Sequence, residues 1–415
     1  MIKVRTRYAP SPTGIPHIGN IRTALYNFLF AKNQKGEFLL RIEDTDQKRL
    51  IPSSIPKIKE SLKILNLQWD QIYVQSKRLS LYQKSLDLLK KKNLVYKEDN
   101  AWRFKVPKNK KISWQDLVHG QVDFVTNVIE DFVIIKSDGF PTYHFASVID
   151  DHDMGITHVI RGDEWISSSP KHLLLYEAFS WAPPKLVHLP PILGSNHKKL
   201  SKREGAKSVI EYIEDGYLAD ALINFLALLG WAPKGDQELF TLDNLIKEFS
   251  HDRLNKNSPI FNLEKLNWFN RKYLQKYSLQ DLSKMIKKFS KLAQNIEEQK
   301  LVKIVDLTRD RLVTLSDFDN VAKIFFEKGK QALPPKEKIQ SAKTAIQSIG
   351  KWDEQLIIKG LESWISQNNL DPADFKNTLR LSVFADNTPP IYQSLATLSR
   401  EQVLSRIDDA IKKSK

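Results

Sequence analysis

Residues 4–20 read VRTRYAPSPTGIPHIGN, and this stretch decides the fold expected for the chain. The alternation over Ile2–Tyr8 predicts a short strand, and the prolines and glycines of Ala9–Gly19 predict a loop. From Asn20, a residue type that caps helices, apolar side chains recur with helical period. Glu37–Ile42 then predicts a second strand. A strand, a glycine-containing loop, a helix and a strand are the opening of a nucleotide-binding α/β unit.

The loop before the helix has the chemistry of a phosphate site. The first turn of a helix offers unpaired N–H groups and the positive end of its dipole. Gly19 lets the backbone approach a nucleotide closely, and the His17 ring is able to hydrogen-bond a phosphate oxygen. We therefore expect ATP to be bound by Pro10, Ser11, Thr13, Gly14, His17, Gly19 and Asn20.

A second motif, Lys199–Arg203 (KLSKR), lies in the cationic loop Gly194–Gly205. Three cations on such a loop would stabilise charge on a departing pyrophosphate, with Lys202 as the main point charge that also contacts ATP. The predicted catalytic group is His17, Lys199, Lys202 and Arg203. Each motif alone also fits an ordinary surface loop. Their order, with His17 and Lys202 185 residues apart, fits a split nucleotide-binding fold with an inserted domain.

Other segments predict elements of such a fold. Short strands are expected at Trp102–Val106, Val122–Phe124, Phe132–Lys136 and Ile156–Ile160. Helices are expected at Leu81–Lys92, Lys171–Phe179 and Leu218–Leu229, and helical periodicity continues to the end of the chain.

The two motifs carry a family resemblance. The first resembles the HIGH signature of class I aminoacyl-tRNA synthetases, with Asn20 in place of the last histidine. The second resembles their KMSKS loop, with Leu200 in place of methionine. Five further segments look like bacterial-type glutamyl-tRNA synthetases: Arg7–Gly14, Leu40–Asp46 (LRIEDTD), Ser137–Phe145, Asp150–Trp165 and Pro259–Trp268.

The resemblance implies an α/β fold: a split Rossmann-like (HUP-type) catalytic domain with an inserted α+β domain, followed by all-α C-terminal domains. The expected parts are catalytic halves at 1–82 and 146–206, an acceptor-end insertion at 83–145, a stem-contact domain at 207–278 and an anticodon-binding domain at 279–415.

Two arginines at strand ends point to the amino acid. Arg7 and Arg161 each end a predicted strand, and the carboxyl ends of strands face the ligand in an α/β fold. A guanidinium pairs bidentately with a carboxylate and not with a side-chain amide, so an arginine could select Glu over Gln. The family resemblance implies an L-glutamate pocket of Arg7, Ser11, Glu43, Tyr143 and Arg161, with Glu43 facing the α-amino group. Asp44 and Asp46 are expected to orient the fold by hydrogen bonds rather than to hold a metal.

The insertion is short. Only five residues separate Tyr96 from Trp102, where relatives in the family carry a long helical segment, sometimes with zinc-binding cysteines. With no cysteine in the chain, we expect no zinc site. The basic run Lys108–Lys111 would have to replace lost contacts to the tRNA acceptor arm.

Charge is spread over the whole chain. The 64 Lys and Arg against 49 Asp and Glu give +15, and residues 271–415 hold 26 basic and 18 acidic side chains. A polyanion lying along the protein explains this distribution, as does a lysine-rich genome bias. We expect the basic helices after about Tyr277 to bind the anticodon, with Trp352, Trp364 and Phe384 as base stackers or as core residues.

Together these features predict a glutamate–tRNA ligase that uses ATP with Mg²⁺ and charges tRNA(Glu); whether it also charges tRNA(Gln) stays open. The alternatives are a non-catalytic tRNA-binding paralogue and a nucleotidyltransferase for a small molecule. No stretch reaches the roughly 18 apolar residues of a membrane span, and the absence of cysteine fits a reducing compartment. We expect a cytoplasmic monomer.

Overall fold

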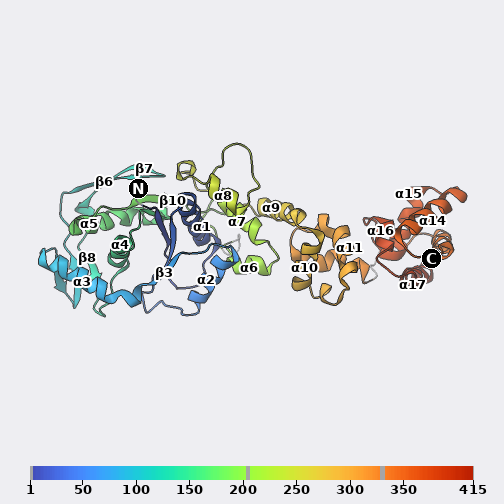
Figure 1. The fold of residues 1–415 in the computed structure, drawn as a ribbon, viewed down its shortest axis with the longest axis horizontal. Coiled ribbons are helices and arrows are strands. Elements are labelled where there is room, and N and C mark those ends of the chain that lie inside the picture. Colours follow the sequence, from blue (N-terminus) through green and yellow to red (C-terminus); the bar gives the residue numbers. More distant parts are fainter. Residues whose placement is uncertain (1–2, 202–205, 328–331, 415) are drawn as a thin grey trace. The chain divides into compact units, whose positions relative to one another are not determined.

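The computed structural model describes residues 3–201, 206–327 and 332–414. These residues form two compact units: one contains those of them up to 214 and from 219 to 269, and the other contains 215–218 and those from 270 onward. In Figure 1 the first unit, blue to yellow, mixes strands and helices, and the second, orange to red, contains helices.

The first unit begins with a parallel sheet in the order β1-β2-β3. Its strands are β1 (Arg5–Tyr8), β2 (Glu37–Ile42) and β3 (Gln71–Val74). The β2 side chains of Phe38, Leu39 and Leu40 are fully buried. Burial of consecutive residues means that both faces of this strand are covered, as is usual in parallel sheets. The connecting helices are α1 (Ile18–Asn33) and α2 (Ser54–Ile64).

A second sheet runs in the order β7-β6-β10-β9 beside the first. Its strands are β6 (Lys111–Asp116), β7 (Gly120–Val125), β9 (His158–Gly162) and β10 (Lys185–Leu189). β9 begins two residues later than expected, because Thr157 is used to join the sheets: its N–H donates to Arg5 O at 3.0 Å. Strands from both halves of the chain thus lie side by side, and the predicted α/β fold class is confirmed.

Residues expected in the insertion are divided between two sheets. The antiparallel sheet β4-β5-β8 contains β4 (Val95–Glu98), β5 (Ala101–Phe104) and β8 (Phe132–Ile135). The unpredicted strand β6 instead pairs in parallel with β10, where Asp116 lies opposite Leu186. This part of the chain therefore reaches the sheet that carries Arg161. The five-part domain division stays a prediction.

Helices cover the strands of the first unit. They are α3 (Leu79–Lys91), α4 (Tyr143–Asp153), α5 (Ser169–Phe179), α6 (Val209–Glu214), α7 (Ala219–Leu228) and α8 (Leu242–Glu248). The predicted helices at 81–92, 171–179 and 218–229 are confirmed, with ends shifted by one or two residues. Helix α1 contacts α7 and α8, and Tyr26 on α1 donates its hydroxyl to Leu229 O at 3.0 Å. Helix α9 (Leu263–Lys276) carries the chain onward.

Within its described residues, the second unit contains helices joined by turns and loops, and no strand. Its helices are α10 (Leu279–Phe289), α11 (Glu298–Thr308), α12 (Phe318–Ala322), α13 (Lys336–Ser348), α14 (Glu354–Gln367), α15 (Pro372–Phe384), α16 (Ile391–Leu395) and α17 (Arg400–Lys413). Phe384 is fully buried, so it is core and not a base stacker. Trp352 is half-buried and donates its indole N–H to Leu398 O at 2.8 Å, which fixes its ring within the unit.

Across the described ranges, none of the helices combines the length and apolar character needed to cross a bilayer.

Candidate active site

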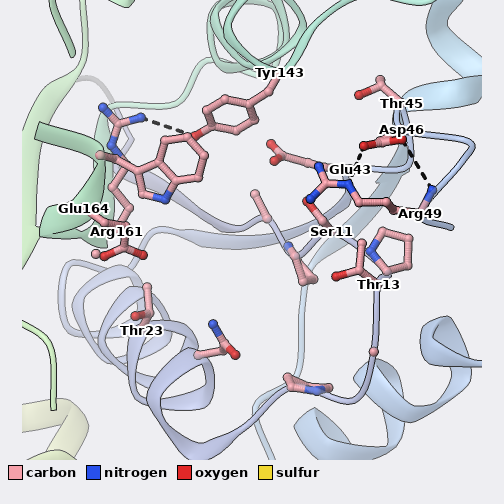
Figure 2. A pocket seen from close by; sticks show the side chains of 18 of the residues that line it. Ser11, Thr13, Thr23, Glu43, Thr45, Asp46, Arg49, Tyr143, Arg161 and Glu164 are labelled. Carbon is pink, nitrogen blue, oxygen red and sulfur yellow. Dashed lines mark hydrogen bonds and ion pairs between the residues drawn. The ribbon is translucent and has the colours of Figure 1, made fainter. Parts of the chain in front are cut away.

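A cavity of about 1080 Å³ lies in the first unit, at the carboxyl ends of β1, β2 and β9. Figure 2 shows side chains that line it, with Tyr143 and Arg161 pointing toward each other and Glu43 pointing into the space beside them. The structure brings together around this one cavity twelve of the predicted site residues: Arg7, Pro10, Ser11, Thr13, Gly14, His17, Gly19, Asn20, Glu43, Tyr143, Arg161 and Lys199. The remaining two, Lys202 and Arg203, lie outside the described residues.

His17, not Asn20, caps helix α1, which begins at Ile18. The predicted cap was wrong because the His17 imidazole itself accepts the Gly19 N–H through Nδ1, at 3.0 Å. With Nδ1 used as an acceptor, the proton of the neutral ring is on Nε2. Partial desolvation and then the positive charge of Lys199 lower the pKa of His17, with Glu164 opposing. At neutral pH His17 therefore offers an Nε2–H donor.

The His17 cap requires a residue without a side chain at position 19. A Cβ at position 19 would lie 2.8 Å from His17 Cε1, closer than two non-bonded carbon atoms approach. Glycine thus lets the ring fold over the start of the helix.

The ends of the second-motif loop are fixed beside α1. Ile18 N–H donates to Lys207 O at 3.0 Å, and a β-bridge joins His17 to Ser208. On the other side Leu200 N–H donates to Ile192 O at 3.0 Å. The contacts of Lys207 and Ser208 place the segment after the KLSKR motif next to the first motif, and Leu200 and Ile192 line the same cavity as His17. Lys199 is exposed at the edge of the cavity.

Arg161 is a buried cation whose contacts within the described structure are all neutral. Its side chain is 5% exposed. It donates to four neutral acceptors: His188 Nε2 at 3.0 Å, Ser169 Oγ at 2.9 Å, His172 Nδ1 at 3.3 Å and Tyr143 Oη at 3.4 Å. Among the residues described, none of the carboxylates lies within 4 Å of the guanidinium. An anion entering the cavity would supply the missing charge.

Arg7, unlike Arg161, is already paired with a carboxylate. Its Nε and Nη2 donate to the two oxygens of Asp151, at 3.0 and 3.4 Å. Asp151 also accepts from Arg41 Nη1 at 2.6 Å, and Arg41 Nη2 donates to Glu43 at 2.9 Å. Arg7, Arg41, Asp151 and Glu43 therefore form a buried cluster with two positive and two negative groups, and little positive charge is left over to hold a substrate carboxylate.

The acidic residues of this cluster have pKa values shifted in opposite directions. Burial raises the pKa of Asp151, but Arg41 and Arg7 together outweigh it and hold the pKa below its usual value. Burial raises the pKa of Glu43, and Arg41 and Arg7 offset only part of this effect. Glu43 is thus the carboxylate with more to gain from an additional positive group.

The other acidic residues after β2 make hydrogen bonds. Asp44 accepts the Ser76 N–H at 2.8 Å, and Asp46 pairs with Arg49 Nε at 2.6 Å. The described residues contain no group of three or more His, Asp or Glu side chains arranged to hold a metal ion.

Sequence reasoning missed the residues that orient the predicted ones. Arg41 and Asp151 lie inside segments that carry the family resemblance, but their roles depend on a contact across 110 residues. His188, Asp116 and His172 lie outside those segments, and Arg161 contacts two of them. Trp165 lines the cavity, with its ring 4.3 Å from that of Tyr143.

Comparison with known proteins agrees with this geometry. The family "tRNA synthetases class I (E and Q), catalytic domain" matches residues 3–101 and 90–268, and an "Anticodon binding domain" family matches residues 274–411. The chain belongs to the class I tRNA synthetases for glutamate and glutamine.

Relatives of this synthetase match over most or nearly all of its length. It is 36% identical to a glutamate–tRNA ligase of Dehalococcoides mccartyi, over 99% of this chain and 97% of the relative. It is 42% identical to one of Carboxydothermus hydrogenoformans, over 78% of this chain and 80% of the relative. The crystal structure of a glutamate tRNA ligase from Elizabethkingia meningosepticum, in complex with its amino acid, superposes with a TM-score of 0.92 at 32% identity and covers 100% of both chains.

Proposed function

We propose that this synthetase is a glutamate–tRNA ligase, which activates L-glutamate with ATP and transfers it to the 3′-terminal adenosine of tRNA(Glu). The observation that carries the proposal is the buried Arg161 cation, which is held by neutral acceptors inside the cavity that also contains the capping His17. A site with an unneutralised guanidinium favours a carboxylate over an amide. The relatives named glutamate–tRNA ligase, which match 99% and 78% of this chain, support the same substrate.

The charges around the cavity suggest how glutamate lies. Its side-chain carboxylate pairs with Arg161 and accepts a hydrogen bond from the Tyr143 hydroxyl. Its α-amino group lies near Glu43 and Ser11. Glu43 is suited to an ammonium group because its raised pKa reflects incomplete compensation of its charge. Arg7 then acts mainly by holding Asp151, which in turn orients Arg41 and Glu43.

ATP occupies the other end of the cavity. Its phosphates lie against the start of α1, where His17 donates through Nε2 and the residues Pro10–Gly14 and Asn20 contact the nucleotide. The α-carboxylate of glutamate attacks the α-phosphorus, and the bond to pyrophosphate breaks. Lys199, Lys202 and Arg203 stabilise the charge that develops on pyrophosphate. Mg²⁺ arrives with ATP, bound mainly by phosphate oxygens and water, so it needs no dedicated protein cage.

The second step uses tRNA as the nucleophile. A hydroxyl of the terminal ribose, the 2′-hydroxyl in class I enzymes, attacks the glutamyl carbonyl and releases AMP. The helical second unit, matched by the anticodon-binding family, binds the other end of the tRNA. The Lys108–Lys111 run is partly occupied within the fold, since Lys110 pairs with Glu177 and Lys111 with Asp123. We further propose that the enzyme acts as a cytoplasmic monomer.

Pyrophosphate exchange tests this function. The purified chain is given ATP, Mg²⁺ and labelled pyrophosphate with glutamate, glutamine or aspartate, each with and without tRNA(Glu). We expect exchange with glutamate only. No exchange with glutamate plus tRNA(Glu) would overturn the proposal and favour a non-catalytic tRNA-binding protein. Whether tRNA(Gln) is also a substrate is decided by the second step, in which transfer of labelled glutamate to purified tRNA(Gln) is measured.

A further inference from the structure

Arg161 is held from behind by a chain of two buried residues, His188 and Asp116. Arg161 Nε donates to His188 Nε2 at 3.0 Å, and His188 Nδ1 lies 2.6 Å from Asp116 Oδ2. His188 is fully buried and Asp116 is 1% exposed. The three residues come from three neighbouring strands, β9, β10 and β6. His188 lies directly opposite Arg161 in the parallel register of β10 and β9.

The hydrogen-bond chemistry fixes the imidazole in one state. A guanidinium N–H can only donate, so His188 Nε2 must accept and carries no proton. The proton is then on Nδ1, which donates it to Asp116. Burial lowers the pKa of His188, against the effect of Asp116, and so favours this neutral ring.

Asp116 is itself held in one orientation. Its Oδ1 accepts the backbone N–H groups of Val118 and His119, both at 3.0 Å. Its Oδ2 is therefore the oxygen that faces His188. Burial raises the pKa of Asp116, but the hydrogen bond from His188 and those from the backbone outweigh it, so the pKa lies below its usual value and the group is a carboxylate.

This arrangement orients the arginine without neutralising it by contact. A carboxylate placed directly on Arg161 would compete with the carboxylate of a substrate. The His188 imidazole, placed between Asp116 and Arg161, holds the guanidinium in one orientation. Because the imidazole is neutral, the charge of the guanidinium remains available to an anion in the cavity. His172 adds a second neutral acceptor through Nδ1, and its Nε2 lies 3.0 Å from His144 Nδ1.

We propose that Asp116 and His188 are positioning residues for glutamate recognition: Asp116 sets the His188 tautomer, and His188 holds Arg161 toward the substrate carboxylate. The inference rests on the proposed function for its substrate, glutamate. It assigns a role in the amino-acid pocket to β6, a strand of the region expected to bind the acceptor end.

The decisive variant is Asp116→Asn, which changes one atom type at nearly constant shape. The Asn oxygen must occupy the Oδ1 position, because two backbone N–H groups point at it. The amide NH₂ then faces His188 Nδ1 and donates to it. The proton of the neutral His188 ring must then lie on Nε2, where it points at the Arg161 Nε–H. In other enzymes, variants that force a histidine into the wrong tautomer are severely impaired.

By analogy with the loss of a hydrogen-bond partner behind a metal-binding histidine, we expect Asp116→Asn to raise KM for glutamate by roughly 10- to 100-fold. It should leave KM for ATP unchanged. The matched control is Asp123→Asn on the adjacent strand β7, where the carboxylate is exposed and pairs with Lys111. It should leave both KM values unchanged. For His188, Gln places an acceptor near the Nε2 position and should retain most glutamate affinity, whereas Leu should lose it.

A readout independent of activity is ¹⁵N NMR of the His188 ring. The wild type should show protonated Nδ1 and unprotonated Nε2, and Asp116→Asn the reverse. A folded Asp116→Asn protein with the wild-type tautomer and wild-type KM for glutamate would overturn the inference, as would equal effects of His188→Gln and His188→Leu. If the wild type shows no glutamate-dependent exchange, the proposed function fails, and the tautomer measurement still tests the arrangement.

Discussion

Replacement of Arg161 by alanine should remove most of the affinity for glutamate and leave ATP binding intact. The guanidinium is 5% exposed and contacts neutral acceptors within the described structure, so its charge is available to a carboxylate in the cavity. Arg7, by contrast, is already paired with Asp151. The two arginines of the predicted pocket should therefore differ in what their removal changes.

The magnitude follows from the contacts that are lost. A planar guanidinium forms two hydrogen bonds with a carboxylate, and each bond to a charged group contributes about 1.5–3 kcal/mol. Water entering the space of the deleted side chain recovers part of this. We expect a net loss of about 3–4 kcal/mol, which is roughly a 100- to 1000-fold rise in KM for glutamate. Arg161→Lys keeps the charge without the planar fork and should fall between the wild type and Arg161→Ala.

Pyrophosphate exchange at saturating ATP and tRNA, with glutamate varied, measures this effect. Arg5→Ala is the control, since Arg5 lies on β1 outside the cavity and pairs with Glu37. It should change KM by less than about threefold, as expected for a partly exposed ion pair. A folded Arg161→Ala enzyme with a wild-type KM for glutamate would refute the assignment of Arg161 to the carboxylate.

Three other substitutions test the proposed site. Gly19→Ala should lower kcat for exchange at least about tenfold by displacing the His17 ring, yet change the unfolding free energy by no more than about 1 kcal/mol, because the gain in helix propensity offsets the lost cap. Asp151→Asn should lower the unfolding free energy by about 3–5 kcal/mol in urea denaturation, since it removes the carboxylate that pairs with the buried Arg7 and one of those that pair with Arg41. Because the folded pKa of Asp151 is lowered, the stability that its carboxylate contributes is present above the ordinary pKa, about 4, and the wild-type advantage should shrink as the pH falls further. Lys202→Ala should slow adenylate formation by about 100-fold or more in single-turnover assays and leave tRNA affinity unchanged.

Each of these has its own counter-result. Normal exchange by Gly19→Ala would show that the His17 cap does not position the ring for catalysis. Asp151→Asn with wild-type stability would mean that the buried cluster tolerates an uncompensated charge. For the loop, Lys198→Ala is a matched control, since Lys198 is exposed and lies outside the cavity lining. If Lys202→Ala formed the adenylate as fast as Lys198→Ala and the wild type, Lys202 would have no role in the chemical step.

The parts of the site that could be predicted from the sequence are those in which chemistry is concentrated in a contiguous segment. His17 ends the loop and Gly19 lies in the first turn of α1, and their proximity to the cavity follows from the strand before the loop and the helix after it. Lys199 could be connected to them because its motif has a known partner motif. The helix start was misplaced because Asn20 is a residue type that commonly caps helices, and only the fold shows that the His17 ring turns back to cap α1 three residues earlier.

The supporting residues could not be predicted, because their roles depend on contacts between distant segments. Asp116 lies 72 residues from His188, and Arg41 lies 110 residues from Asp151. Strand β6 alternates exposed and buried residues over Lys111–Asp116, but the inward position at its end is the carboxylate of Asp116 rather than an apolar group. A polar residue where the pattern expects an apolar one is a common sign of a functional site. In β6, the buried Asp116 breaks the alternation of apolar and polar residues, so the strand was not predicted.

The most direct test of the whole account is aminoacylation by the purified chain. Labelled glutamate, ATP, Mg²⁺ and a tRNA(Glu) that a known glutamyl-tRNA synthetase charges are incubated with the protein, and the acid-precipitable, base-labile label is counted. We expect ATP-dependent ester formation with glutamate, none with glutamine, and a sharp loss in Arg161→Ala. A folded wild-type chain that forms no glutamyl ester on this tRNA would contradict it.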